Sequence, residues 1–327
     1  MLKKIFKVVG IVLGAGLLLV VSFVVWKLAS YERDFTGVRL PNIHASQDPA
    51  VIAQGEYLVH SVAHCSACHG PASVVTHHQL PSNLQDMRGG YALRAGPFGT
   101  FYPSNITSDR ETGIGAVSDG QLARVIRHGV GRNGRYAAFM GLVVGNMADE
   151  DLTAIISYLR TLPAIRNAVP DDEWGIVAKL ISANFNPHPN RPIHYVPAGA
   201  LSRERGEYLA TGPAACSGCH TPTDPMNGFA PTGPLFSGEG HAEPDPTDSA
   251  YEFVVPNLTP DATGVMTGWD EDQFVARMRA GRVHAGSKMP WENFARMTEN
   301  DLRSIYRYLH TLPATSHDVG TSRRHAG

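Results

Sequence analysis

Hydrophobic and polar positions divide the chain into an apolar N-terminal stretch and a longer part with amphipathic patterning. Residues 8–26 carry no charge and follow three lysines among the first seven residues. About twenty apolar residues are what a membrane-spanning helix needs, whereas a cleavable signal peptide has a core of about 7 to 15 and a small-x-small site. We therefore predict an uncleaved single-pass anchor and short spacer over residues 1–34, with a removed signal peptide as the alternative. By the positive-inside rule the rest of the chain lies outside the cytoplasm.

Beyond the anchor, apolar residues recur with the period of amphipathic helices. Ser118 and Gln121 have the spacing of a capping box ahead of such a run, and Asp270 and Gln273 repeat it. A glycine follows each run at the place of a C-terminal cap. A further amphipathic helix is predicted to end before each of the prolines Pro163 and Pro313. No convincing alternating strand pattern is present, so the sequence predicts an all-α fold.

From about residue 48 the sequence repeats itself once. Gly-Glu-Tyr-Leu occurs at 55–58 and 206–209, Asn-x-Thr at 105–107 and 257–259, and Tyr-Leu-x-Thr-Leu-Pro at 158–163 and 308–313. The offsets of the repeat drift only between 149 and 153, which indicates two copies of one structural unit. Two copies are too few for a solenoid, so we expect each to have its own core.

The repeat sets the predicted domain boundaries. We expect a first domain over 35–163, a linker with one amphipathic segment over 164–200, a second domain over 201–313 and a flexible tail over 314–327. The two domains contain long Gly- and Pro-rich loops, which are unusual in an ordinary small domain. A large apolar cofactor around which these loops wrap would account for them.

The composition excludes few classes of binding partner. The chain has 327 residues, of which 43% are hydrophobic and 18% charged, and its formal net charge is −2. These values are ordinary for a globular protein. A basic surface for nucleic acid is not indicated, so we expect no nucleic-acid partner.

All four cysteines lie in two copies of a Cys-x-x-Cys-His motif. The first comprises Cys65, Cys68 and His69, and the second comprises Cys216, Cys219 and His220. This pentapeptide is typical of c-type haem attachment, because two thiols one helical turn apart can join the two vinyl groups of one porphyrin while the histidine ligates the iron. A structural zinc site would need further ligands at short spacing, and a thioredoxin-like redox pair would need neither the histidine nor a second copy. We therefore predict two covalently bound haem c groups.

With these motifs, the chain resembles the membrane-anchored multi-haem cytochrome c subunits of bacterial periplasmic alcohol, aldehyde and gluconate dehydrogenases. The resemblance extends over nearly everything after the anchor. It depends on the Gly-Glu-Tyr-Leu segment before each haem motif and on the runs 105–109 and 257–261 with the Thr-Gly pairs that follow them. It implies two tandem cytochrome c-like domains on the periplasmic side of the inner membrane. Many such subunits carry three haems and a C-terminal anchor, whereas this chain has two motifs and an N-terminal anchor.

The same resemblance implies a methionine ligand on the second face of each haem, some 70 to 80 residues after the motif. Met140 or Met147 is available in the first copy, and Met289 or Met297 in the second. Met297 precedes Thr298, which with Asp301 has the spacing of a capping box, and this gives Met297 a structural role at the start of the last helix. Met140 and Met289 lie in loops before it. We therefore assign His69 with Met140 and His220 with Met289 as the iron ligands.

These assignments favour an electron carrier over an enzyme. Iron with both axial positions filled transfers single electrons and has no open position for a substrate. We expect electrons to come from a periplasmic dehydrogenase or a quinol and to pass to a terminal oxidase or a soluble cytochrome. The alternatives are a di-haem, peroxidase-like enzyme with one exchangeable distal site, and a cytochrome subunit of a respiratory oxidase.

Overall fold

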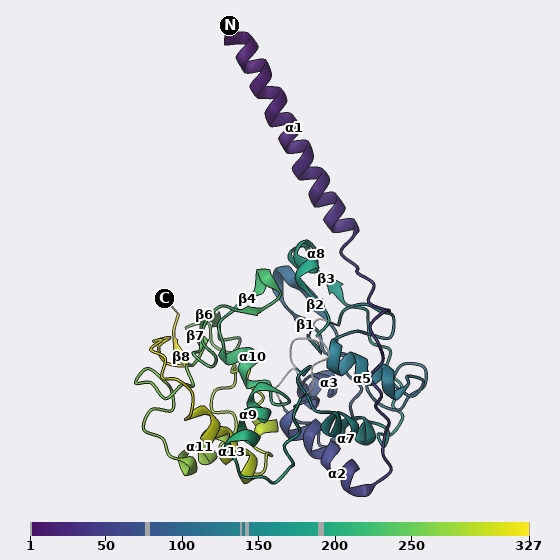
Figure 1. Ribbon diagram of the computed structural model, residues 1–327, viewed down its shortest axis with the longest axis vertical. Helices are drawn as coiled ribbons and strands as arrows, with labels where there is room; N and C mark the ends of the chain where they lie inside the picture. Colours follow the sequence, from purple (N-terminus) through teal and green to yellow (C-terminus); the bar gives the residue numbers. More distant parts are fainter. Residues whose placement is uncertain (1, 76–78, 138, 141–143, 189–192, 327) are drawn as a thin grey trace.

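The computed structural model describes residues 2–75, 79–137, 139–140, 144–188 and 193–326. It consists of one long N-terminal helix, α1 (Leu2–Ala29), and a globular head that carries the remaining described residues (Figure 1). Over residues 3–29, α1 is long and apolar enough to cross a membrane, and none of its apolar stretch is buried in the head. The predicted anchor is therefore a continuous helix that projects from the head.

Each copy of the repeat is organised around a crossed pair of helices. In the first copy α2 (Pro49–Tyr57) packs on α7 (Asp149–Leu159), and in the second α9 (Arg203–Thr211) packs on α13 (Glu299–Leu309). A glycine lies at each crossing: a Cβ on Gly55 would lie 1.9 Å from the carbonyl oxygen of Ala154, and one on Gly206 would lie 1.8 Å from that of Ser304. Only glycine allows the two backbones to approach so closely.

The head also contains shorter helices. They are η1 (Leu58–Val62), α3 (Ser66–His69), α4 (Ala72–Val75), η2 (Gly96–Phe98), α5 (Asp119–His128), α8 (Ile176–Ile181), η3 (Ser182–Asn184), α10 (Cys216–His220), η4 (Pro225–Asn227), α11 (Glu271–Arg279) and α12 (Trp291–Phe294). Both predicted capping boxes are confirmed, at Ser118 before α5 and at Asp270 before α11. Gly129 and Gly281 both take the left-handed conformation after these helices.

The all-α prediction is only partly right, because the head also contains short antiparallel strands. Three small sheets have the orders β1-β2-β3, β4-β5 and β6-β7-β8. The strands are β1 (Leu93–Arg94), β2 (Gly99–Phe101), β3 (Glu173–Trp174), β4 (Thr223–Asp224), β5 (Ala230–Pro231), β6 (Glu239–Pro244), β7 (Tyr251–Val255) and β8 (Arg323–His325). They come from the long loops and from the tail. The tail over 314–327, predicted to be flexible, thus contributes β8, which pairs with β7.

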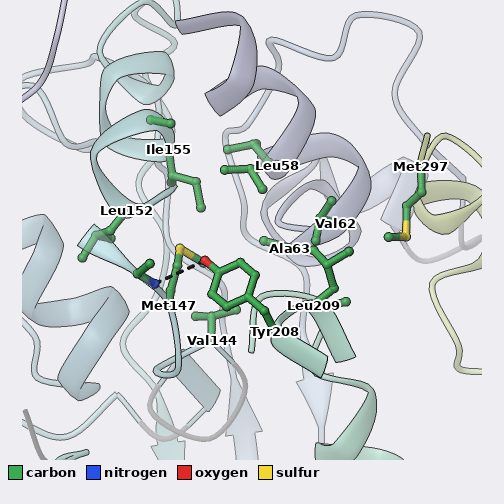
Figure 2. Packing of buried hydrophobic residues seen from close by; sticks show 14 of the residues in the cluster. Leu58, Val62, Ala63, Val144, Met147, Leu152, Ile155, Tyr208, Leu209 and Met297 are labelled. Atoms are coloured by element: carbon green, nitrogen blue, oxygen red, sulfur yellow. Dashed lines mark hydrogen bonds between the residues drawn. The ribbon is translucent and has the colours of Figure 1, made fainter. Parts of the chain in front are cut away.

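The prediction of two separate cores is wrong, because the buried apolar residues of both copies form one continuous cluster. Figure 2 shows how Tyr208 of the second copy enters the first, where it lies among Val144, Met147 and Leu152. Its hydroxyl accepts from the Ala148 N–H at 3.2 Å. The copies therefore share buried apolar surface.

The tyrosines of the two Gly-Glu-Tyr-Leu segments make reciprocal contacts across this shared core. Tyr57 donates to Asp301 at 2.6 Å and accepts from the Thr298 N–H at 3.0 Å. Tyr208 donates to Asp151 at 2.7 Å, so each tyrosine reaches the start of the last helix of the other copy. Burial and then the Asp301 carboxylate raise the pKa of Tyr57, which keeps its hydroxyl protonated as a donor.

These contacts correct the capping box predicted at Thr298. The Thr298 hydroxyl does accept from the Asp301 N–H. The Asp301 carboxylate, however, does not return to the Thr298 N–H, which donates to Tyr57 instead. The Asp301 carboxylate accepts instead from Arg205, whose Nε donates to it at 2.9 Å, and both side chains are almost fully buried.

Candidate haem sites

The two Cys-x-x-Cys-His motifs have the same local structure. Each forms one short helix, α3 or α10, and each is entered through a non-glycine residue in the left-handed region: His64 has φ 42° and Ala215 has φ 52°. Such backbone conformations cost of order 1–3 kcal/mol and cluster at functional sites. Their recurrence directly before both motifs indicates that the turn is needed to present the motif.

The cysteines differ within each motif in the same way. Cys65 and Cys216 are half-buried against the shared core, whereas Cys68 and Cys219 are exposed, and all four thiols are free. Desolvation, and then the neighbouring cysteine, raise the pKa of Cys65 and of Cys216 to about 12. These values favour neutral thiols over the thiolates that a metal site would require.

Both motif histidines have one ring nitrogen engaged by a backbone carbonyl. His69 donates from Nδ1 to the Ser104 carbonyl oxygen at 2.7 Å, and His220 donates likewise to that of Pro256 at 3.0 Å. This tautomer leaves Nε2 with a lone pair, and desolvation lowers the pKa of both histidines. A neutral imidazole oriented through its other nitrogen is the usual arrangement of a metal-ligating histidine.

The carbonyls that accept from the two histidines are distant from them in the chain. They lie 35 residues after His69 and 36 residues after His220. Each immediately precedes an Asn-x-Thr segment, so the repeated Asn-x-Thr motif is the sequence signal that marks them.

The Asn-x-Thr segments hold these carbonyl-bearing loops in place. Asn105 accepts from the backbone and the hydroxyl of Thr107 and donates to the Ile165 carbonyl at 2.8 Å. Asn257 makes the corresponding contacts with Thr259 and with the Thr315 carbonyl at 2.8 Å. Both asparagines are buried. These contacts give both Asn-x-Thr segments a structural role beside the candidate site.

Sequence reasoning missed two glycines that complete the arrangement. The Gly89 N–H donates to the His69 carbonyl at 2.8 Å, and the Gly238 N–H donates to that of His220 at 2.9 Å. Both have positive φ, and a Cβ on either would lie within 2.8 Å of the backbone next to the acceptor carbonyl. Their equivalent positions in the repeat, 149 residues apart, are the signal that could have identified them.

The four candidate methionines separate into two groups. Met147 and Met297 are 1% exposed and lie in the core. Met140 and Met289 are half-buried and pack against its edge, as do Cys65 and Cys216. A thioether at the edge of the core is free to ligate, whereas one inside it is committed to packing. The burial therefore fits the assignment of Met140 and Met289.

The first motif is also in contact with the second copy. Asn293 of α12, four residues after Met289, donates from Nδ2 to the Ser66 hydroxyl and to the His60 carbonyl, both at 2.8 Å. The neighbouring Phe294 ring lies 5.5 Å from that of His64. The segment that follows one candidate ligand thus lies against the other attachment motif, so the two sites are neighbours.

Taken together, each copy presents the donor set of a c-type haem site. There are two free thiols one turn apart, a neutral histidine with its Nδ1 satisfied, and a half-buried methionine at the edge of an apolar cluster. These residues fit the group that the sequence implies.

Known proteins similar to this chain include cytochrome c subunits. No protein-family model matches the chain. It is 29% identical over 292 residues to the cytochrome c subunit of a quinone alcohol dehydrogenase from Gluconacetobacter polyoxogenes, covering 81% of this chain and 57% of that protein. It is 28% identical over 278 residues to the gluconate 2-dehydrogenase cytochrome c subunit of Pantoea cypripedii, covering 79% and 55%.

A third relative is nearer to this chain in length. The chain is 26% identical over 266 residues to a diheme cytochrome c-type protein of Cereibacter sphaeroides, covering 76% of this chain and 82% of that protein. The chain spans little more than half the length of the dehydrogenase subunits. The resemblance to multi-haem cytochrome c subunits expected from the sequence is confirmed.

Proposed function

We propose that this protein is a membrane-anchored di-haem electron carrier. Each copy of the repeat is one cytochrome c-like domain with one covalently bound haem c. Cys65 and Cys68 attach the first haem and His69 and Met140 ligate its iron; the second site uses the cysteines Cys216 and Cys219 with the ligands His220 and Met289. When bound, the haem iron supplies one-electron redox chemistry.

The observation that carries this proposal is the twofold occurrence of one histidine arrangement. In both copies a Cys-x-x-Cys-His histidine donates from Nδ1 to a distant backbone carbonyl, and a buried Asn-x-Thr segment holds that carbonyl. Such a contact fixes the ring orientation and raises ligand basicity. Proteins with cytochrome c names among the relatives support electron transfer as the general role.

The protein's own residues define what the sites can do. His69 and His220 hold their proton on Nδ1 and present Nε2. Met140 and Met289 would supply the second ligand of each iron and would leave no place there for water or a substrate.

The partners follow from the relatives and from α1. We propose that α1 crosses the inner membrane of a bacterium once and that the head lies in the periplasm. Electrons would come from a periplasmic dehydrogenase or a quinol and leave to a terminal oxidase or a soluble cytochrome. In this scheme the chain is an electron-transfer subunit of an oxidoreductase complex and not an enzyme by itself.

Spectroscopy of the purified protein with matched methionine variants tests the proposal. Two low-spin haems per chain, with neither binding carbon monoxide when reduced, are expected for the wild type. Met289→Leu should lose the weak methionine-to-iron absorption of one haem and gain carbon monoxide binding, whereas Met297→Leu, in the core, should do neither. One high-spin haem in the wild type would refute the carrier assignment for its domain and favour the peroxidase-like alternative. Co-purification with haem-copper subunits would identify the respiratory oxidase alternative.

A further inference from the structure

The end of the head next to α1 exposes apolar side chains from the linker and from the second copy of the repeat. Helix α8 contacts α1 and lies directly below its C-terminal end (Figure 1). Ile176 of α8 is 58% exposed, and Met226 and Phe229, which follow β4, are 52% and 38% exposed. We call these three residues the apolar rim.

The rim is continuous because the linker joins its parts. Asn184, just after α8, donates to the Met226 carbonyl at 2.8 Å. The Phe229 ring lies 6.4 Å from the ring of Phe185 in the linker and 6.4 Å from that of Phe98 in the first copy. β4, which leads into this segment, lies at the same end of the head as α8 (Figure 1).

The length of α1 determines how far this end of the head lies from a bilayer. The 19 uncharged residues of α1 rise about 28 Å at 1.5 Å per residue, close to the roughly 30 Å of a hydrocarbon core. Trp26 then lies at the lipid–water boundary, where tryptophan is enriched. Tyr31, five residues later, is already in the head: its ring lies 5.8 Å from that of Trp174 and 4.8 Å from the Lys179 Nζ.

The tether between these two points is short. Trp26 and Tyr31 lie at most about 12 Å apart, because the chain from one to the other rises through three helical residues and two extended ones. Each headgroup layer is itself about 5 to 8 Å thick. A single helix of a partner protein is about 10 Å across, so there is no room for a protein layer between this end of the head and the lipid.

We infer that the apolar rim rests on the lipid surface and inserts Ile176, Met226 and Phe229 into the headgroup layer. This inference rests on the proposed membrane anchor. Charges of both signs lie close by, with the exposed Asp171 and Glu173 in the linker and the basic Arg33 and Lys179 beside them. Among these described residues no single-sign patch attracts anionic lipid, so apolar insertion supplies the contact. Helix η4, which begins five residues after His220, would then lie at the membrane surface. The pair α2 and α7 lies at the far end of the head (Figure 1).

Photo-crosslinking of the full-length holoprotein in phosphatidylcholine nanodiscs tests the inference. Benzoylphenylalanine is placed at one position per variant, replacing Leu17 in α1, Ile176, Met226 or Glu299, and adducts are identified by mass spectrometry. Glu299, at the start of α13, has a side chain that is 59% exposed and serves as the control far from α1. Lipid adducts at positions 17, 176 and 226 and none at 299 are expected.

The other outcomes separate the two claims. Adducts at 17 with none at 176 and 226 would overturn the rim contact and leave the anchor intact. Absence of adducts at 17 would overturn the anchor on which the inference rests. In membranes from cells that express the protein, cross-links from 176 or 226 to another polypeptide instead of lipid would show that a protein occupies the rim, and would also overturn the inference.

Discussion

The buried ion pair between Arg205 and Asp301 should make the two copies of the repeat respond differently to the same substitution. Asp301 and Asp151 occupy equivalent positions at the start of α13 and α7, and each accepts from a tyrosine of the other copy. Only Asp301 also accepts from a buried arginine. The equivalent of Arg205 in the first copy is Gln54.

Asp301→Asn removes the charge that compensates the fully buried guanidinium of Arg205. Breaking a buried ion pair by removing one partner costs about 3–5 kcal/mol, and we expect a loss of that size in the free energy of unfolding at pH 7. Asp151→Asn removes a carboxylate whose pKa is raised by burial and which attracts Arg205 without forming an ion pair with it in the described part of the chain. Tyr208 can still donate to the amide oxygen of the asparagine. We therefore expect this control to stay within about 1 kcal/mol of the wild type.

Guanidinium chloride unfolding of the purified holoprotein in detergent, followed by circular dichroism, measures both variants. The double variant Arg205→Gln with Asp301→Asn removes both charges, imitates the glutamine of the first copy and should recover most of the loss. Equal losses for Asp151→Asn and Asp301→Asn, or no recovery in the double variant, would refute the argument that the uncompensated charge causes the effect.

Three further predictions follow from single contacts. Gly206→Ala places a Cβ 1.8 Å from the Ser304 carbonyl oxygen and should lower the free energy of unfolding by about 1–3 kcal/mol through overpacking. The control Gly14→Ala, with nothing within 4 Å of the new Cβ, should leave it unchanged. Thermal unfolding measures both variants. Burial lowers the pKa of His60 from 6.5 to about 4. Above pH 6.5 the neutral ring therefore contributes about 3 kcal/mol to the free energy of unfolding, and this contribution is lost as the pH falls toward 4. His60→Phe should flatten the stability profile in that window, and an unchanged acid slope would contradict this. Asn257→Ala should loosen the carbonyl that accepts from the second motif histidine and raise the reduction potential of that haem in a spectroelectrochemical titration, and a potential equal to the wild-type value would count against it.

Features encoded by neighbouring residues could be predicted from the sequence. The capping boxes at Ser118 and Asp270 need only residues three apart, and the apolar run 8–26 needs only its own length. In each case the determining signal lies within a few positions of the residue concerned.

Features that depend on distant backbone could not be predicted in this way. The acceptors for His69 and His220 are carbonyls of Ser104 and Pro256, and a carbonyl belongs to every residue, so nothing in the side chains marks it. The pairing of β8 with β7 likewise depends on backbone bonds between segments about 70 residues apart. A polar tail without apolar periodicity gives no sign of such a partner.

The shared core has a consequence for how the first site forms. Ser66 lies between Cys65 and Cys68, and it is fully buried with its hydroxyl held by Asn293 of the second copy. The fold of α3, and with it the spacing of the first pair of thiols, therefore includes a contact from more than 220 residues further along the chain. Tyr57 likewise donates to Asp301 of the second copy. Without the second copy these polar groups would face water and the shared apolar surface would be exposed, so the first copy is less stable alone than within the whole chain. The two copies of the repeat are thus joined by a shared apolar cluster and by a contact at the first candidate haem site.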